Sequence, residues 1–199
     1  MTSGMRVREK SIKHLIYILV ILTISLCMCE DESDNEILTD DYFPLKVSYV
    51  WIYESIGFQD TICLTREVTD KIEMNGKDYF IITESYENNL DVDYDTLRKD
   101  EKNRIWKYHT GTDYLLFDFT KDEGETYRYP SYSEDFVVSI FLIDSVKTKA
   151  GNFENCLNFF FCIPIYIDSE TWYVFAPGIG LVERIVGEGF SFYLTSYNF

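Results

Sequence analysis

The sequence predicts an all-β protein, a single curled antiparallel sheet or partly open barrel-like domain that follows an N-terminal signal segment. Short runs rich in Val, Ile, Tyr, Phe and Trp recur from residue 41 onward, as strands prefer. Turns that contain Gly and Asn separate these runs. No segment keeps the 3.6-residue apolar period of an amphipathic helix. The composition, 46% hydrophobic and 17% aromatic, is sufficient for a core.

Residues 1–26 are predicted to be a signal peptide. A positive region comes first, and its basic residues are Arg6, Arg8, Lys10 and Lys13. The apolar run at 15–26, LIYILVILTISL, follows it. A run of this length fits the core of a signal peptide and is short for a spanning helix, which needs about 20 residues. An uncleaved membrane anchor is the alternative.

The apolar run ends at two cysteines, Cys27 and Cys29, where the chain resembles the lipobox of bacterial lipoproteins. In that motif a signal peptidase cuts just before a cysteine that carries lipid. Cys27 is the favoured attachment site, because Ile24 and Ser25 suit the third and second positions before the lipid-bearing cysteine. The apolar run also ends directly at Cys27. Cys29 is the alternative, and neither cysteine follows a small residue. A CxC metal pair is disfavoured because no further ligands lie close in sequence.

Residues 27–41 are predicted to form an acidic tether. The stretch at 30–41, EDESDNEILTDD, holds seven acidic residues and no basic one, so it repels itself and stays extended. It also resembles a surface-export signal of some Gram-negative lipoproteins. The net charge of −16, with no Lys/Arg cluster outside the first 13 residues, argues against nucleic-acid binding.

Residues 42–199 are predicted to form the β-rich domain. Ile62, Leu64, Val68 and Ile72 alternate with polar residues, which indicates a strand with one buried face. Asn75-Gly76 then predicts a tight hairpin. The best helix candidate, 95–107, is interpreted as another hairpin. The remaining predicted strands are 104–109, 113–119, 136–146, 152–167, 171–175, 181–186 and 190–197.

No catalytic residue, metal site or cofactor is predicted. The chain has no nucleophile, phosphate-binding or zinc-protease motif, and beyond residue 26 its only histidine is His109, beside a glycine turn. The run DVDYD at 91–95 begins like a calcium loop, but Thr96 and Lys102 occupy the positions that need Gly and Glu. A looser surface calcium site is the alternative. The last three cysteines, Cys63, Cys156 and Cys162, are expected to be buried thiols. A disulfide from Cys63 to either of the other two is the alternative.

Four segments resemble a broad group of uncharacterised bacterial envelope lipoproteins. They are DYFPLKVSYVWIYE at 41–54, YLLFDFTKDEGETY at 114–127, VKTKAGNFENCLNF at 146–159 and WYVFAPGIGLVERI at 172–185. Ser48 stands where the group has a turn glycine, and Phe175 where it has tyrosine. The resemblance implies a curled antiparallel β-sheet domain, and it implies no catalytic residue.

The sequence therefore predicts a non-enzymatic, lipid-anchored protein of the cell envelope, periplasmic or surface-exposed, that serves as a binding or structural module. Its expected partners are the membrane, through the N-terminal lipid, and a protein, glycan or apolar ligand; the ligand-binding residues stay unassigned. A carrier that holds lipid or another apolar ligand in a half-barrel cavity is one alternative. A hydrolase of envelope polymers is ranked last.

Overall fold

The computed structural model describes residues 41–56, 61–87, 91–130, 135–164, 166, 169–187 and 190–199. The predicted signal peptide and the two candidate lipid-attachment residues, Cys27 and Cys29, lie outside the described residues. Within these ranges every regular element is a strand, and no helix long and apolar enough to cross a membrane occurs among them. The all-β prediction is confirmed.

Twelve strands form one sheet, and each strand pairs antiparallel with its neighbours. The strands are β1 (Val50–Ile56), β2 (Cys63–Met74), β3 (Lys77–Tyr86), β4 (Val92–Lys99), β5 (Arg104–His109), β6 (Thr112–Asp118), β7 (Thr126–Pro130), β8 (Asp135–Lys147), β9 (Asn152–Cys162), β10 (Thr171–Ala176), β11 (Gly180–Val186) and β12 (Phe190–Asn198).

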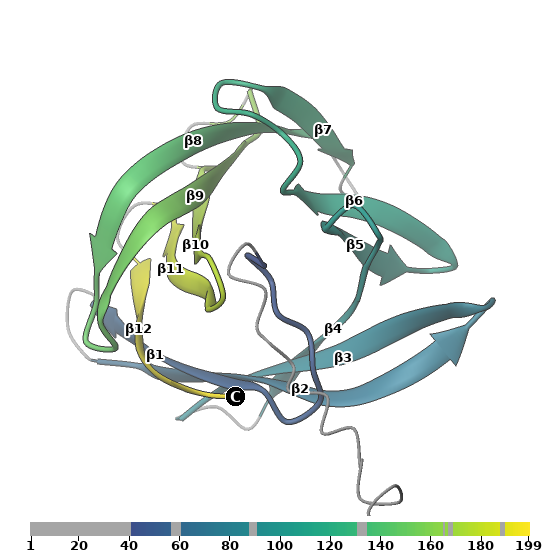
Figure 1. The fold of residues 1–199 in the computed structure, drawn as a ribbon, viewed down its shortest axis with the longest axis horizontal. Helices are drawn as coiled ribbons and strands as arrows, with labels where there is room; N and C mark the ends of the chain where they lie inside the picture. Colours follow the sequence, from purple (N-terminus) through teal and green to yellow (C-terminus); the bar gives the residue numbers. More distant parts are fainter. Residues whose placement is uncertain are drawn as a thin grey trace, which may run out of the picture. The chain divides into compact units, whose positions relative to one another are not determined.

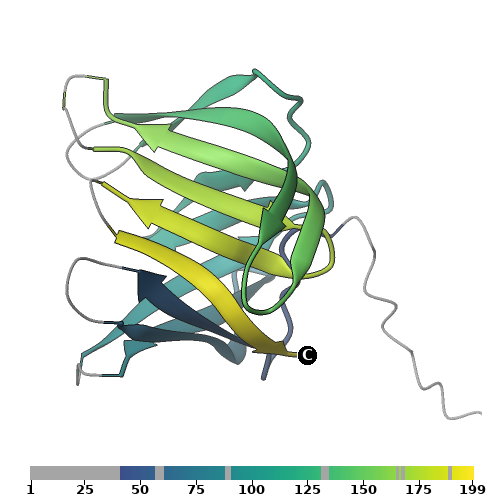
Figure 2. The ribbon, with the colours of Figure 1, turned by 90° about the vertical axis from the view of Figure 1, so that its left-hand side faces the viewer.

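The first and last strands lie side by side in the middle of the sheet, whose order is β6-β5-β4-β3-β2-β1-β12-β11-β10-β9-β8-β7. Trp51 on β1 faces Tyr197 on β12 in this pairing. Each half of the chain is thus an up-and-down meander, and the sheet curls until its two edge strands, β6 and β7, approach each other (Figure 1). Figure 2 shows the meander of the second half from outside. The predicted curled, partly open sheet is confirmed.

The seam between β6 and β7 lacks the backbone ladder that joins all other neighbouring strands. A side chain bridges it instead, because the Tyr127 hydroxyl donates a hydrogen bond of 2.6 Å to the Leu116 carbonyl. Burial raises the pKa of this phenol, and nearby Asp118 raises it further. The hydroxyl is therefore protonated and able to donate over the whole physiological pH range.

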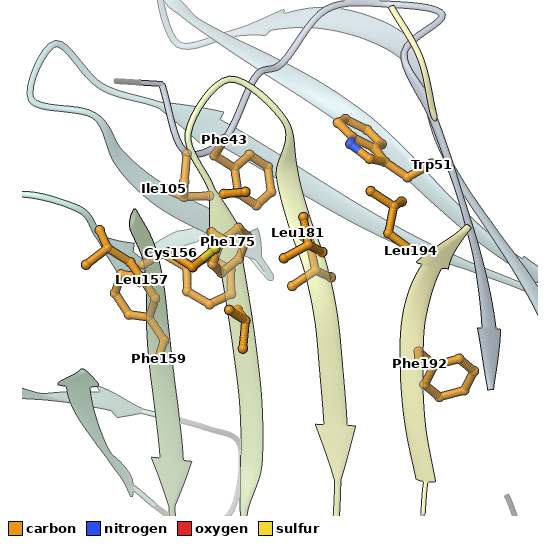
Figure 3. Packing of buried hydrophobic residues seen from close by; sticks show 14 of the residues in the cluster. Phe43, Trp51, Ile105, Cys156, Leu157, Phe159, Phe175, Leu181, Phe192 and Leu194 are labelled. Carbon is orange, nitrogen blue, oxygen red and sulfur yellow. The ribbon is translucent and has the colours of Figure 1, made fainter. Parts of the chain in front are cut away.

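Aromatic rings fill one part of the interior of the curled sheet. Phe43, from the segment before β1, lies 5.6 Å from Phe175 and 6.0 Å from Phe117, measured between ring centroids. Phe117 and Phe159 meet edge to face at 5.3 Å. Figure 3 shows Phe43, Phe159 and Phe175 among the buried residues of this core. Rings in such geometry stabilise beyond the area that they bury.

Asp41, the last residue of the predicted tether, is already part of the folded domain. Lys99 Nζ lies 2.6 Å from one Asp41 carboxylate oxygen, and the Gly178 amide donates to the Asp41 carbonyl at 2.8 Å. The Phe43 amide also donates to the Asp41 carboxylate. These contacts fix the start of the domain between the end of β4 and the turn that joins β10 to β11.

Most predicted strands are present, with particular exceptions. The segment 104–109 is confirmed as β5, 95–107 is a hairpin, and Asn75 and Gly76 take the positive φ values, 54° and 70°, of a tight turn. The predicted strand 152–167 is too long, since β9 ends at Cys162. The short edge strand β7 was not predicted, because Arg128 and Pro130 interrupt its apolar pattern.

The predicted buried face of β2 is correct only in its first half. Leu64 and Val68 are buried, but Ile72 is only half-buried. A bulge between Val68 and Asp70 shifts the register and turns the end of the strand outward. Before this bulge Arg66 alternates in step with Leu64 and Val68, so it also faces inward and is buried.

Candidate functional site

A polar cavity of about 180 Å³ lies inside the curled sheet. Charged, hydroxyl-bearing and aromatic side chains line it together, contributed by strands from both halves of the chain. The lining residues are Arg66, Glu84, Asp95, Lys107, Leu116, Phe117, Tyr129, Phe136, Phe161, Thr171, Tyr173 and Arg184. Charged side chains in a sheet interior are costly to bury, so this cavity is the leading candidate for a functional site.

Two arginines share one carboxylate at the centre of this cavity. Arg184 Nη1 lies 3.0 Å from Glu84 Oε2, and Arg66 Nε lies 3.6 Å from Glu84 Oε1. The three side chains retain only 8% to 15% of their exposure. We call Arg66, Glu84 and Arg184 the charged triad.

The pairing of the strands explains the triad. Arg66 on β2 faces Glu84 directly on the adjacent strand β3. Arg184 lies on β11 opposite Tyr173 of β10 and Phe192 of β12, and it reaches Glu84 across the curled sheet. Each arginine also packs on an aromatic ring: Arg66 lies 5.5 Å from the Phe43 centroid and Arg184 lies 5.0 Å from that of Phe192.

The triad is ionised. Burial alone would raise the pKa of Glu84, but the Arg66 and Arg184 guanidiniums outweigh burial and hold this pKa below its usual value. Burial opposes the charge of Arg184 as well, while Glu84 raises its pKa. The triad thus carries one negative and two positive charges.

A second ion pair lies at the same cavity, between Lys107 on β5 and Asp95 on β4. Both side chains keep about a third of their exposure, 32% and 29%, so this pair is closer to solvent than the triad. Burial lowers the pKa of Lys107, and the Asp95 carboxylate more than restores it. Lys107 therefore stays positively charged.

Hydroxyl groups complete the polar part of the lining. Burial raises the pKa of Tyr173 and of Tyr129, so both phenols are protonated at neutral pH and can donate hydrogen bonds. Tyr86 lies beside the cavity, and Arg184 Nη2 donates to its hydroxyl at 3.4 Å. These groups suit recognition of ligand oxygens.

One donor of the triad is unused. The Nε of Arg184 is buried and has no hydrogen-bond acceptor among the described residues. A buried guanidinium nitrogen without an acceptor costs free energy comparable to a lost hydrogen bond. Arg184 lines the cavity, so a small rotation of its side chain would bring this unsatisfied donor to an acceptor from outside the chain.

Aromatic rings form the other wall of the cavity. Phe161 lies 5.3 Å from Tyr173 and 5.8 Å from Tyr129, measured between ring centroids, and Phe136 packs on Phe161 at 6.2 Å. Phe117 contacts the same group from β6. The site thus combines a charged half with an apolar half.

Of the residues singled out from the sequence, Asp95 lines the cavity, whereas His109 and the three described cysteines do not. His109 is the last residue of β5 and does not line the cavity. Cys63, Cys156 and Cys162 are free thiols, so the disulfide alternative is wrong. Burial raises the pKa of Cys156 to about 11, which leaves it a packed thiol and not a nucleophile.

Two further hollows have different character. One, beside Trp51 and Gly180, is apolar but encloses only about 10 Å³, too little for a lipid chain. The other is an open groove of about 500 Å³ that corrects the expectation of no basic cluster, since Lys77 meets there four basic residues that lie within positions 98–104. Its lining is Lys77, Asp78, Arg98, Lys99, Asp100, Glu101, Lys102 and Arg104.

Four of the five basic residues of this groove are engaged with carboxylates. Arg98 and Lys77 both bind Asp113, at 2.7 and 3.1 Å. Arg104 binds Asp100 at 2.7 Å, and Lys99 binds Asp41. The groove is therefore an ion-pair network of nearly balanced charge.

The predicted calcium alternative has a competitor for its ligands. Asp95, the third acid of the DVDYD run, is taken up by Lys107. Among the described residues, no three His, Cys, Asp or Glu side chains are grouped so that they could hold a metal ion.

Sequence reasoning did not find the charged triad. Its members are far apart in the chain, so only the strand order brings them together. A local signal was nevertheless present: Arg66 stands between Leu64 and Val68, on the face predicted to be buried. A charged residue in a buried register marks a site that needs a partner.

No family model and no curated protein matches this chain. Two solved structures resemble its fold. A candidate exported protein with a YmcC-like fold from Bacteroides fragilis is 14% identical, with a TM-score of 0.51, over 80% of this chain and 100% of that one. A candidate lipoprotein from Parabacteroides distasonis is 11% identical, with a TM-score of 0.50, over 80% and 99%. At these identities the likeness establishes a shared fold.

Proposed function

We propose that this chain is a lipid-anchored protein of the cell envelope whose β-rich domain is a non-enzymatic binding module. The N-terminal pattern supports export and anchoring at Cys27, with Cys29 as the alternative. The two proteins of similar fold are described as a candidate exported protein and a candidate lipoprotein, which agrees with this location. The membrane is the partner of the lipid, and the domain binds a second partner.

The interior cavity is the binding site in this proposal. The observation that carries it is the unused Nε of Arg184, buried beside a cavity of about 180 Å³ with an unbalanced set of charges. A site that only stabilised the fold would favour paired charges or an apolar core. Here Arg184 instead keeps an unsatisfied donor beside the cavity that it lines.

The two alternatives fit the geometry less well. An apolar carrier needs a cavity of several hundred cubic ångströms with apolar lining. Here aromatic rings pack the interior, and the cavity of about 180 Å³ is lined by charged side chains. A hydrolase needs a poised base or nucleophile, whereas the carboxylates of the cavity, Glu84 and Asp95, are both held in ion pairs.

Anchoring is tested by intact mass and by labelling of the full-length protein with radioactive palmitate in its own host. Lipid is expected on Cys27, and Cys27→Ala is expected to abolish labelling. Label retained in Cys27→Ala and lost in Cys29→Ala would move the attachment to the alternative residue. If the double variant still partitions with membranes, the lipoprotein assignment fails.

Binding is tested by native mass spectrometry of the full-length protein purified from its host. A bound small molecule is expected, and Thr171→Phe should displace it because the added ring enters the cavity lining. Thr112→Phe, at an exposed position at the start of β6, is the matched control. A protein free of ligand in every preparation would contradict the binding module.

A further inference from the structure

We infer that the ligand of the interior cavity is a small organic anion, with a carboxylate or phosphate group held by Arg184 and Arg66 and an apolar part against the aromatic wall. The inference rests on the proposed binding function and deepens it. Four properties of the lining carry it: charge, free donors, size and the division into two halves.

The charge of the lining is positive. Three cations, Arg66, Lys107 and Arg184, face two carboxylates, Glu84 and Asp95. This sign is opposite to that of the chain, whose net charge is −16. A net charge held out of water is costly unless an ion of opposite sign accompanies it. One monovalent anion would balance the cavity.

The donors of Arg184 suit such an ion. Its Nη1 binds Glu84 and its Nη2 reaches Tyr86, but its buried Nε has no acceptor. Guanidinium groups bind carboxylates and phosphates through parallel donors, so an anion oxygen would satisfy the unused nitrogen once the side chain rotates toward the cavity. The protonated phenol of Tyr173, opposite Arg184 in the strand register, supplies a further donor.

The size and the apolar half define the rest of the ligand. A volume of about 180 Å³ is equivalent to roughly six water molecules, since each occupies about 30 Å³ in the liquid. Phe117, Phe136 and Phe161 form a wall that an inorganic ion would leave unused. A ring or short chain that bears one anionic group fills both halves.

The experiment titrates full-length protein with benzoate, phenyl phosphate, benzamide and inorganic phosphate, monitored by calorimetry and thermal shift. Benzoate or phenyl phosphate is expected to bind, which also separates the carboxylate from the phosphate source. Benzamide, the neutral isostere, should bind at least about tenfold more weakly, because it carries no charge. Inorganic phosphate should bind weakly, because it leaves the apolar wall uncovered. Equal binding of benzamide would overturn the inference and leave the binding module standing.

Two variants with opposite expected effects on anion binding distinguish a lost contact from a folding defect. Arg184→Gln should weaken anion binding at least about tenfold, because a direct partner is lost. Arg128→Gln, an exposed arginine with a 76% exposed side chain, should leave it unchanged. Asp95→Asn removes a partly exposed negative charge and should tighten binding about threefold. A purely structural cluster predicts no gain from Asp95→Asn, so an absent gain overturns the inference.

Native ligands separate the two proposals further. If native mass spectrometry finds a bound molecule that is neutral, the anion inference is wrong while the binding function holds. If neither a native ligand nor any anionic probe binds, both proposals fail.

Discussion

Arg184 and Glu84 are 100 positions apart in the chain, yet Arg184 Nη1 donates to Glu84 Oε2 at 3.0 Å across the interior of the sheet. Their strands, β11 and β3, are separated in the sheet by β12, β1 and β2. The contact therefore joins the two meanders inside the curl as well as through the β1–β12 ladder. It also places the only carboxylate of the triad between two guanidiniums.

Glu84→Gln is expected to lower the free energy of unfolding by about 2–4 kcal/mol, because it leaves two buried guanidiniums without a counter-charge. Urea denaturation measures the loss. Asp78→Asn removes a 58% exposed carboxylate paired with Lys71 and should cost less than about 1 kcal/mol. A loss in Glu84→Gln as small as that in the control would mean that water already screens the triad.

The fold could be predicted from local signals, whereas the site could not. Period-two alternation and the Asn75-Gly76 turn are properties of neighbouring residues; the turn is present, and the alternation holds in the first half of β2. The triad depends on β1 pairing with β12, which no local pattern specifies. Of the three residues, only Arg66 carried a local signal. It is a charged residue at a position of β2 that the alternation predicts to be buried.

Ser48→Gly is expected to raise the free energy of unfolding by about 0.5–1 kcal/mol. Ser48 has a φ of 75° in the turn before β1, where a side chain is strained by about 1–2 kcal/mol. The greater freedom of glycine in the unfolded chain offsets part of that gain.

Thermal and urea unfolding of Ser48→Gly and Ser48→Ala measure this effect. The alanine variant keeps the strain, so it should not gain stability. Equal stability of all three proteins would show that the hydrogen bond of 2.8 Å from the Ser48 amide to the Val68 carbonyl already offsets the strain.

Gly180→Ala should destabilise the protein more than Gly76→Ala. Both glycines have positive φ, 96° and 70°, so both variants carry strain of about 1–2 kcal/mol. A Cβ at Gly180 would also lie 3.3 Å from Trp51 Nε1, whereas one at Gly76 meets nothing within 4 Å. Trp51 Nε1 donates to the Ile179 carbonyl at 2.7 Å, and displacing it should cost about 1 kcal/mol more.

Urea denaturation of the two alanine variants gives the difference. Trp51 fluorescence supplies a second readout, since only the Gly180 variant should alter the surroundings of that ring. Equal losses in the two variants would show that backbone strain alone sets the cost at both turns.

Protonation of Asp100 should lower the free energy of unfolding in acid. Burial alone would raise its pKa, but hydrogen bonds from Arg104, Trp106 and the Lys102 amide lower it to about 2. A carboxyl whose pKa falls on folding stabilises the protein above its unfolded pKa and loses that contribution as the pH falls. About 1–2 kcal/mol should disappear between roughly pH 4 and pH 2.

Unfolding free energies measured from pH 6 down to pH 2 test this expectation. Asp100→Asn should have a smaller slope in the acid range, and Trp106→Phe, which removes one donor to Asp100, should be intermediate. An unchanged slope in Asp100→Asn would assign the acid loss to other carboxylates.

Tyr127→Phe should loosen the seam between β6 and β7 (Figure 1). The lost hydroxyl leaves the Leu116 carbonyl without the donor that now lies 2.6 Å away, at a cost of about 1–3 kcal/mol. Leu116 and Tyr129 line the interior cavity from the two sides of this seam. Amide hydrogen exchange should therefore accelerate in the edge strands β6 and β7 and stay unchanged in β1 and β12. Uniform acceleration across the sheet would instead mean that the hydroxyl stabilises the whole domain, and the seam would not be a local opening toward the cavity.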